Sequence, residues 1–205
     1  MTKIKEKFTE LEEKNQKALI AYIMVGFPNE KATVSTVRGL VKGGVDIIEL
    51  GFPFSDPLAD GPVIQNASTI SLEKGTKIEK LFTLVKKIRK ETNIPLILMT
   101  YTNILYHKGY AKFISEAKKA GIDGFILPDM SIEESKEYLQ AAKNKSDTIF
   151  LISPNTNKTR IEKISKVTSG FLYLVAIYGT TGIKTGIKNY TLKAIKEVKK
   201  QTRGK

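Results

Sequence analysis

Apolar segments of strand length recur along this chain and alternate with amphipathic segments. They begin near Leu19, Val45, Pro95, Ile122, Thr148 and Phe171. Most are separated by roughly 25 residues, a length typical of a βα unit, and the second and third are about twice as far apart. Most of the segments are apolar on both faces, which is typical of parallel strands covered by helices. The alternation therefore predicts an α/β fold with a parallel sheet.

Polar residues indicate where two of the helices begin. Asn29 is a suitable N-cap for a helix that starts at the next residue. Ser131 and Glu134 have the spacing of a capping box, which predicts a helix from Ile132. The longer second gap has room for an additional helix over about residues 63–73. The pattern over residues 4–14 predicts a further helix, packed against one end of the sheet.

Six βα units fit either an open doubly wound sheet or a closed barrel. A doubly wound nucleotide-binding sheet would carry a G-x-G-x-x-G turn after the first strand, whereas residues 25–28 read Val-Gly-Phe-Pro. An eight-fold barrel is typically about 250 residues long and needs two more units. We therefore expect one domain over residues 1–205. We expect this domain to be a TIM (β/α)8 barrel that contains an N-terminal helix and about the first six βα units but lacks the last two.

Composition narrows the classes of function. There is no cysteine, and a single histidine, His107, disfavours a histidine-built metal site or a Ser-His-Asp triad. The net charge of +13 comes mostly from lysines spread over the helical segments, so we expect a solvated surface and no nucleic-acid partner. No apolar run approaches the ~20 residues of a membrane helix, and the N-terminal segment lacks the apolar core of a secretion signal. We expect a cytoplasmic protein without a membrane partner.

Candidate chemistry is concentrated in residues 49–67. Glu49 ends a mostly apolar strand, and ligands of parallel α/β proteins bind at the carboxyl ends of strands. Desolvation there should raise the pKa of the carboxyl, which suits a general acid/base; the alternative is a buried acid paired with a lysine. Asp56 and Asp60 follow in a loop that three prolines restrict. Either aspartate could instead cap a turn.

The string ELGFPFSDPLADGPVIQNA, at residues 49–67, resembles the signature of the tryptophan synthase alpha subunit family. Further segments resemble that family in the same order along the chain. They are residues 22–28, 98–103, 123–129, 153–156, Tyr173 and residues 179–182. The resemblance extends from about Ala18 to the end of the sequence.

The resemblance implies a lyase of tryptophan biosynthesis. The family cleaves indole-3-glycerol phosphate to indole and glyceraldehyde 3-phosphate by a retro-aldol reaction without a cofactor. Glu49 matches the general acid/base, and Asp60 matches the carboxylate that accepts a hydrogen bond from the indole N–H. Tyr173 matches a tyrosine near that glutamate, with an ordinary core aromatic as the alternative.

The resemblance also implies residues that bind the substrate. The positions that match a flat slot for indole are Tyr22, Met99, Tyr101, Ile126 and Leu151; core packing is the alternative for each. At the first of these the family leads us to expect phenylalanine, so Tyr22 is a departure. Thr181 and Gly182 match a mobile lid, for which an ordinary flexible loop is the alternative.

The family works with a beta subunit, in an alpha2-beta2 type complex, and pyridoxal phosphate belongs to that partner. Pro53, Asp56 and Asn103 match contact positions. The G-F-G-like turn and the G-S pair that hold the substrate phosphate in the family do not occur in these 205 residues, so we expect weak or absent activity. Two alternatives remain: a non-catalytic module that binds and tunes the beta subunit, and a different phosphate-binding barrel.

Overall fold

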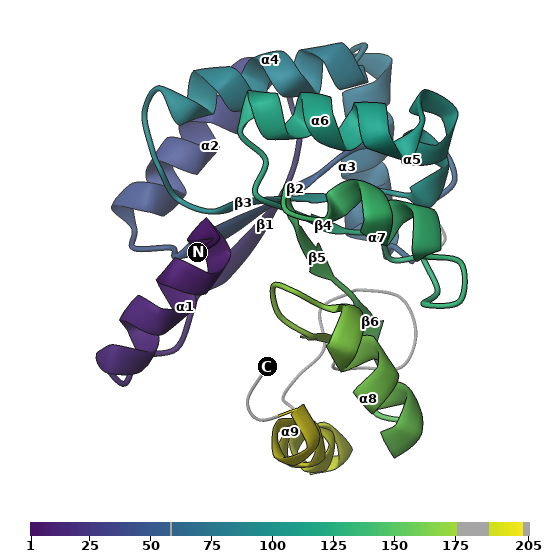
Figure 1. The fold of residues 1–205 in the computed structure, drawn as a ribbon. Coiled ribbons are helices and arrows are strands. Elements are labelled where there is room, and N and C mark those ends of the chain that lie inside the picture. Colours follow the sequence, from purple (N-terminus) through teal and green to yellow (C-terminus); the bar gives the residue numbers. More distant parts are fainter. Residues whose placement is uncertain (58, 176–188, 203–205) are drawn as a thin grey trace.

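The computed structural model describes residues 1–57, 59–175 and 189–202. Five strands form one parallel sheet, in which each strand pairs with the next along the chain (Figure 1). They are β1 (Ile20–Met24), β2 (Ile47–Gly51), β3 (Leu96–Met99), β4 (Gly124–Ile126) and β5 (Asp147–Ile149). This sequential order without a reversal is the order of a barrel, and a doubly wound sheet would reverse direction.

The fifth predicted strand forms in two parts. β5 ends at Ile149, and β6 (Leu151–Ile152) pairs in parallel with β7 (Tyr173–Leu174). Phe150 lies between the two parts, and its carbonyl accepts a hydrogen bond from the Tyr173 amide at 3.0 Å. The backbone therefore continues from the five-stranded sheet into the next pair of strands. All six predicted strand positions are confirmed to within two residues.

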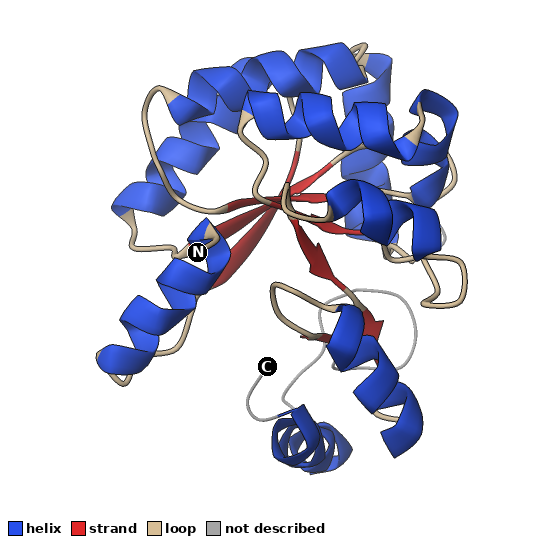
Figure 2. Cartoon of the chain, in the orientation of Figure 1, coloured by secondary structure: helices blue, strands red, loops and turns tan. Residues whose placement is uncertain are grey.

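The helices alternate with the strands, as the pattern predicts (Figure 2). They are α1 (Lys3–Glu13), α2 (Glu30–Lys42), α3 (Pro62–Glu73), α4 (Ile78–Arg89), α5 (Thr102–Lys108), α6 (Tyr110–Ala120), α7 (Lys136–Ala142), α8 (Lys158–Val167) and α9 (Asn189–Thr202). The additional helix in the long gap is α3. The N-cap at Asn29 is confirmed, because its Oδ1 accepts the Ala32 amide at 2.9 Å.

The predicted start of a helix at Ile132 is wrong, because α7 begins at Lys136. The capping-box contacts do form: the Ser131 hydroxyl accepts the Glu134 amide at 3.3 Å and donates to its carboxylate at 2.8 Å. They enclose a turn, however. The Ser135 amide and hydroxyl both donate to the Ile132 carbonyl, at 3.4 and 2.8 Å, and a helical amide from Lys136 would need that acceptor.

The sheet separates two apolar layers. Helices α2, α4 and α6 cover one face, and α1 lies on the other side (Figure 1). Ile4 of α1 packs into the inner layer, 3.0 Å from the point where a Cβ on Gly124 would lie. The rest of the inner cluster comes from the strands: Ile47, Ile97, Ile126 and Ile149. The N-terminal helix therefore packs on the sheet, as predicted, and forms the apolar floor beneath the inward-facing strand residues.

Candidate active site at the carboxyl ends of the strands

Glu49 is the charged residue of β2 and is 5% exposed. In the sheet register it lies between Tyr22 of β1 and Ile97 of β3. Side chains alternate along a strand, so Glu49 shares a face with Ile47 of the inner apolar cluster. Among the described contacts, none is a hydrogen bond to the Glu49 carboxyl, and no ion pair of these residues joins it to a lysine. Burial raises the pKa of Glu49 to about 7, as the sequence led us to expect.

Glu49→Gln is expected to stabilise the folded protein at pH 8. The folded glutamate keeps its proton up to about pH 7, whereas an unfolded one releases it near 4.5. Between these values the folded state binds more protons, so stability falls as pH rises, and the full cost is present above pH 7. Glutamine avoids this cost, and we expect about 1–3 kcal/mol more unfolding free energy at pH 8. Urea denaturation should show little gain at pH 5; an equal gain at both pH values would contradict a buried ionising Glu49.

Asp60 lies on the loop between β2 and α3 and is half-buried. Its amide donates to the Pro57 carbonyl at 3.1 Å, and its own carbonyl accepts the Gln65 side-chain amide at 2.9 Å. The carboxylate accepts a hydrogen bond from the Tyr101 hydroxyl at 3.4 Å. Burial raises the pKa of Asp60, and this hydrogen bond opposes the rise. The N-cap of α3 is Gly61, and no side-chain hydrogen bond caps that helix.

The loop that carries Asp60 is fixed at its other end. The Ser68 hydroxyl of α3 accepts the Phe54 amide and donates to the Phe54 carbonyl, both at 2.9 Å. The Phe54 ring stacks on Tyr101 with 4.8 Å between ring centroids. The prolines therefore act together with a side-chain anchor, which sequence inspection missed because no local pattern pairs a serine with a residue 14 positions earlier.

Two tyrosines interact with the site carboxylates. The Tyr22 ring lies over Gly51, where an added Cβ would be 2.0 Å from its hydroxyl oxygen, so only glycine leaves room for this tyrosine. Burial and the charges of Asp60 and Glu49 raise the pKa of Tyr22. Burial and the charge of Glu49 raise the pKa of Tyr173. The structure thus brings Tyr22 and Tyr173 to the same end of the strands as Glu49 and Asp60.

The other slot candidates differ in accessibility. Ile126 is completely buried in the inner cluster, and Met99 and Leu151 pack against that cluster while remaining partly exposed. Met99 pairs with Gly51 and with Ile126 in the sheet register. Met99 and Leu151 can therefore contact a ligand, whereas Ile126, which lies beside Met99 in the register, is completely buried.

Two groups of predicted residues remain. Thr181 and Gly182, the lid candidates, lie outside the described residues. Among the partner-contact candidates, Asp56 and Asn103 are exposed, whereas Pro53 is buried within the chain and offers a partner little surface.

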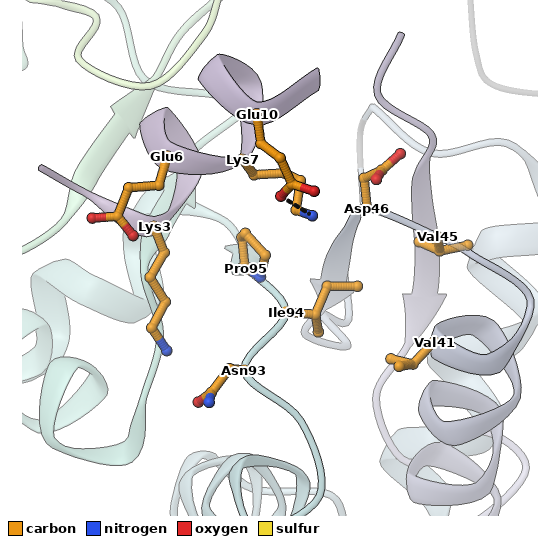
Figure 3. Close-up of a pocket in the computed structure, with 10 residues that line it drawn as sticks. All are labelled: Lys3, Glu6, Lys7, Glu10, Val41, Val45, Asp46, Asn93, Ile94 and Pro95. Carbon is orange, nitrogen blue, oxygen red and sulfur yellow. Dashed lines mark hydrogen bonds and ion pairs between the residues drawn. The ribbon is translucent and has the colours of Figure 1, made fainter. Parts of the chain in front are cut away.

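A surface pocket of about 640 Å³ lies at the opposite ends of the strands, between α1 and the segments before β2 and β3 (Figure 3). Of the charged residues that line it, Lys7 pairs with Glu10 at 2.8 Å, and Asp46 accepts the Leu19 amide at 2.8 Å. The chemistry described above is therefore remote from this pocket.

Within the described ranges, no cluster of three or more His, Cys, Asp or Glu side chains is arranged to hold a metal ion. In these same ranges, no helix has the length and apolar content that a membrane span requires.

Comparison with known proteins assigns the family. A family model described as tryptophan synthase alpha chain matches residues 8–204. The chain is 40% identical over 203 residues to the tryptophan synthase alpha chain of Acaryochloris marina, covering 98% of this chain and 76% of the relative. It is 46% identical over 197 residues to that of Methanosarcina barkeri, covering 96% of this chain and 74% of the relative.

Solved structures agree. Tryptophan synthase subunit alpha from Legionella pneumophila superposes with a TM-score of 0.90 at 34% identity, covering 99% of this chain and 76% of that one. A chain of the tryptophan synthase α2β2 complex from Pyrococcus furiosus superposes with a TM-score of 0.86 at 37% identity, covering 92% and 76%. The chain belongs to the tryptophan synthase alpha chain family, lyases of tryptophan biosynthesis with a TIM-barrel fold.

Proposed function

We propose that this chain, as a single barrel domain in the cytoplasm, cleaves indole-3-glycerol phosphate to indole and glyceraldehyde 3-phosphate. The observation that carries the proposal is Glu49, a buried carboxyl at a strand end whose pKa is raised to about 7. A group with that pKa can donate and accept a proton at neutral pH, which a retro-aldol cleavage requires of one residue. The buried Glu49 carboxyl also favours a lyase over a non-catalytic module. If the inner face of the sheet were purely structural, an apolar residue at position 49 would make the protein more stable.

The two carboxylates, Glu49 and Asp60, carry out the chemical steps of the cleavage. Protonated Glu49 gives its proton to indole C3, and Asp60 accepts the hydrogen bond of the indole N–H as positive charge develops on that nitrogen. Ionised Glu49 then removes the proton of the glycerol hydroxyl next to the ring. The new carbonyl forms as the C–C bond breaks, and its electron pair returns to the indole. These proton transfers and bond changes need no added cofactor.

The proposed binding residues follow from the same arrangement. Met99, Leu151 and Tyr22 would contact the indole, with Tyr173 beside Glu49. No G-F-G-like turn or G-S pair in the 205 residues provides the amide groups that would bind the phosphate. Phosphate binding positions the reacting end of a substrate, so we propose that turnover by this chain is low.

We further propose a beta subunit as the partner, with Asp56 and Asn103 as exposed contact residues. Support comes from the Pyrococcus furiosus relative, which is described as part of an α2β2 complex. Indole release from indole-3-glycerol phosphate, measured with and without a beta subunit, tests the function. Indole formed in both cases supports a lyase. Binding to the beta subunit without indole formation in either case would support the non-catalytic module.

Asp60→Asn is expected to lower the rate of indole release by about 10²-fold, because the amide keeps the size of the side chain but loses the charge that stabilises the indole nitrogen. Steady-state indole formation checks this. Glu73→Gln removes an exposed charge from the far end of the helix that follows Asp60 and serves as the matched control. Equal rates for both variants would show that the Asp60 charge does not act on the reaction.

A further inference from the structure

The Asp60 carboxylate has a hydrogen-bond partner from a different strand connection. The Tyr101 hydroxyl, 41 residues further along the chain, donates to Asp60 Oδ2 at 3.4 Å. Among the ion pairs of the described residues, none includes Asp60. The orientation of this carboxylate therefore depends on a neutral phenol instead of a cation.

The Tyr101 ring is itself fixed. It is 7% exposed and stacks on Phe54 at an interplanar angle of 26°. Ser68 holds Phe54 by two backbone hydrogen bonds. A ring confined in this way keeps its hydroxyl at one position, because rotation would break the stack.

The backbone that follows Tyr101 is anchored from the next loop. The Asp129 carboxylate accepts the Thr102 amide at 2.9 and 3.1 Å and the Thr102 hydroxyl at 2.8 Å. Tyr101 thus connects three loops, which follow β2, β3 and β4. These are the loops at the end of the sheet that carries Glu49.

The hydroxyl has a defined donor and acceptor role. Its oxygen accepts the Ala59 amide at 3.1 Å, so its own proton is available for Asp60. A separation of 3.4 Å is longer than an ordinary O–H···O hydrogen bond. Hydrogen bonds in active sites commonly shorten when a substrate binds, and Ala59 and Asp60 are consecutive residues held against the same hydroxyl.

We propose that Tyr101 is a positioning residue whose hydroxyl, fixed by Ala59 and by the stack on Phe54, orients the Asp60 carboxylate. This inference rests on the proposed function. It assigns Tyr101 a role in orienting the Asp60 carboxylate toward the indole N–H, in addition to its predicted contact with the indole ring. The Tyr101 hydrogen bond also opposes the effect of burial on Asp60. Within the part of the chain that the structure describes, Tyr22 also interacts electrostatically with Asp60.

The test is a carboxyl ¹³C NMR titration of Asp60 in the full chain and in Tyr101→Phe. Loss of the hydroxyl leaves the desolvation of Asp60 unopposed, so its pKa should rise by about 0.5 unit. Tyr138→Phe is the matched control, because the Tyr138 hydroxyl is buried and has no hydrogen-bond partner among the described residues. Its removal should leave the titration of Asp60 unchanged. Equal titrations of Asp60 in the parent chain and in Tyr101→Phe would overturn the proposal.

A second measurement uses the unmodified chain and needs no folded variant. The Tyr101 ¹³Cζ resonance should shift with the same midpoint as Asp60, and the Tyr138 resonance should not. A Tyr101 resonance that is insensitive to that step would also overturn the proposal. Neither titration depends on turnover, so absent indole release would contradict the proposed function while leaving this inference to its own result.

Discussion

Glu49→Gln is expected to lower indole release from indole-3-glycerol phosphate by at least about 10³-fold. The reaction uses this carboxyl twice, first as the acid at indole C3 and then as the base at the glycerol hydroxyl, and an amide can do neither. The burial that raises the pKa of Glu49 also keeps water from replacing it. Single-turnover indole formation at pH 7, with enzyme in excess, isolates the chemical step.

The control for this loss is Glu12→Gln, which neutralises an exposed glutamate on α1 at the other end of the strands. It should keep the parent rate. Near-normal turnover by Glu49→Gln would contradict the assigned chemistry and would favour a different phosphate-binding barrel that shares only the fold.

Arg89→Met is expected to destabilise the protein by about 3–5 kcal/mol, because it breaks a buried ion pair. The Arg89 guanidinium, with a side chain 13% exposed, pairs with Asp123 and donates to the carbonyls of Gly121 and Ile94. Asp123 also accepts the Leu96 amide at 3.0 Å. These bonds join the end of α4 to the beginnings of β3 and β4, so methionine would leave a buried carboxylate and two carbonyls without this donor.

The chain provides a matched control in Arg38→Met. Arg38 also makes two hydrogen bonds to one carboxylate, that of Glu91, but its side chain is 53% exposed. Water and salt weaken such a pair, so its loss should cost much less unfolding free energy than the loss of the buried Arg89 network. Urea denaturation of both variants at pH 7 gives the comparison; equal losses of unfolding free energy would show that the buried network contributes no more than a surface pair.

The strand positions could be predicted because parallel strands covered on both sides are apolar on both faces. The interruption at Phe150 could not, since Phe150 is as apolar as its neighbours and the change of pairing depends on where β7 lies. The helix start at Lys136 differed from the prediction for a related reason. A capping box stabilises any turn of that spacing, and the Ser135 hydroxyl then occupies the carbonyl that the helix would need.

The candidate site likewise has one feature that the sequence predicts and others that it does not. The place of Glu49 at a strand end, and hence its raised pKa, follows from strand order and burial, which the sequence pattern indicates. The contact between Tyr101 and Asp60 depends on how two loops approach each other in space, and neither residue has a local pattern that pairs them. Gly51 is similar, because its lack of a side chain has meaning only beside the Tyr22 hydroxyl.

The most direct test of the central claim is a carboxyl ¹³C NMR titration of Glu49 and Asp60 in one sample of the unmodified chain. The structure predicts that Glu49 titrates near pH 7 because its carboxyl is buried. Asp60, which is only half-buried and receives the Tyr101 hydroxyl, should ionise at a lower pH. Two carboxylates in different protonation states at neutral pH are what the proposed cleavage requires. A Glu49 that titrates near its ordinary value of 4.5 would contradict the account.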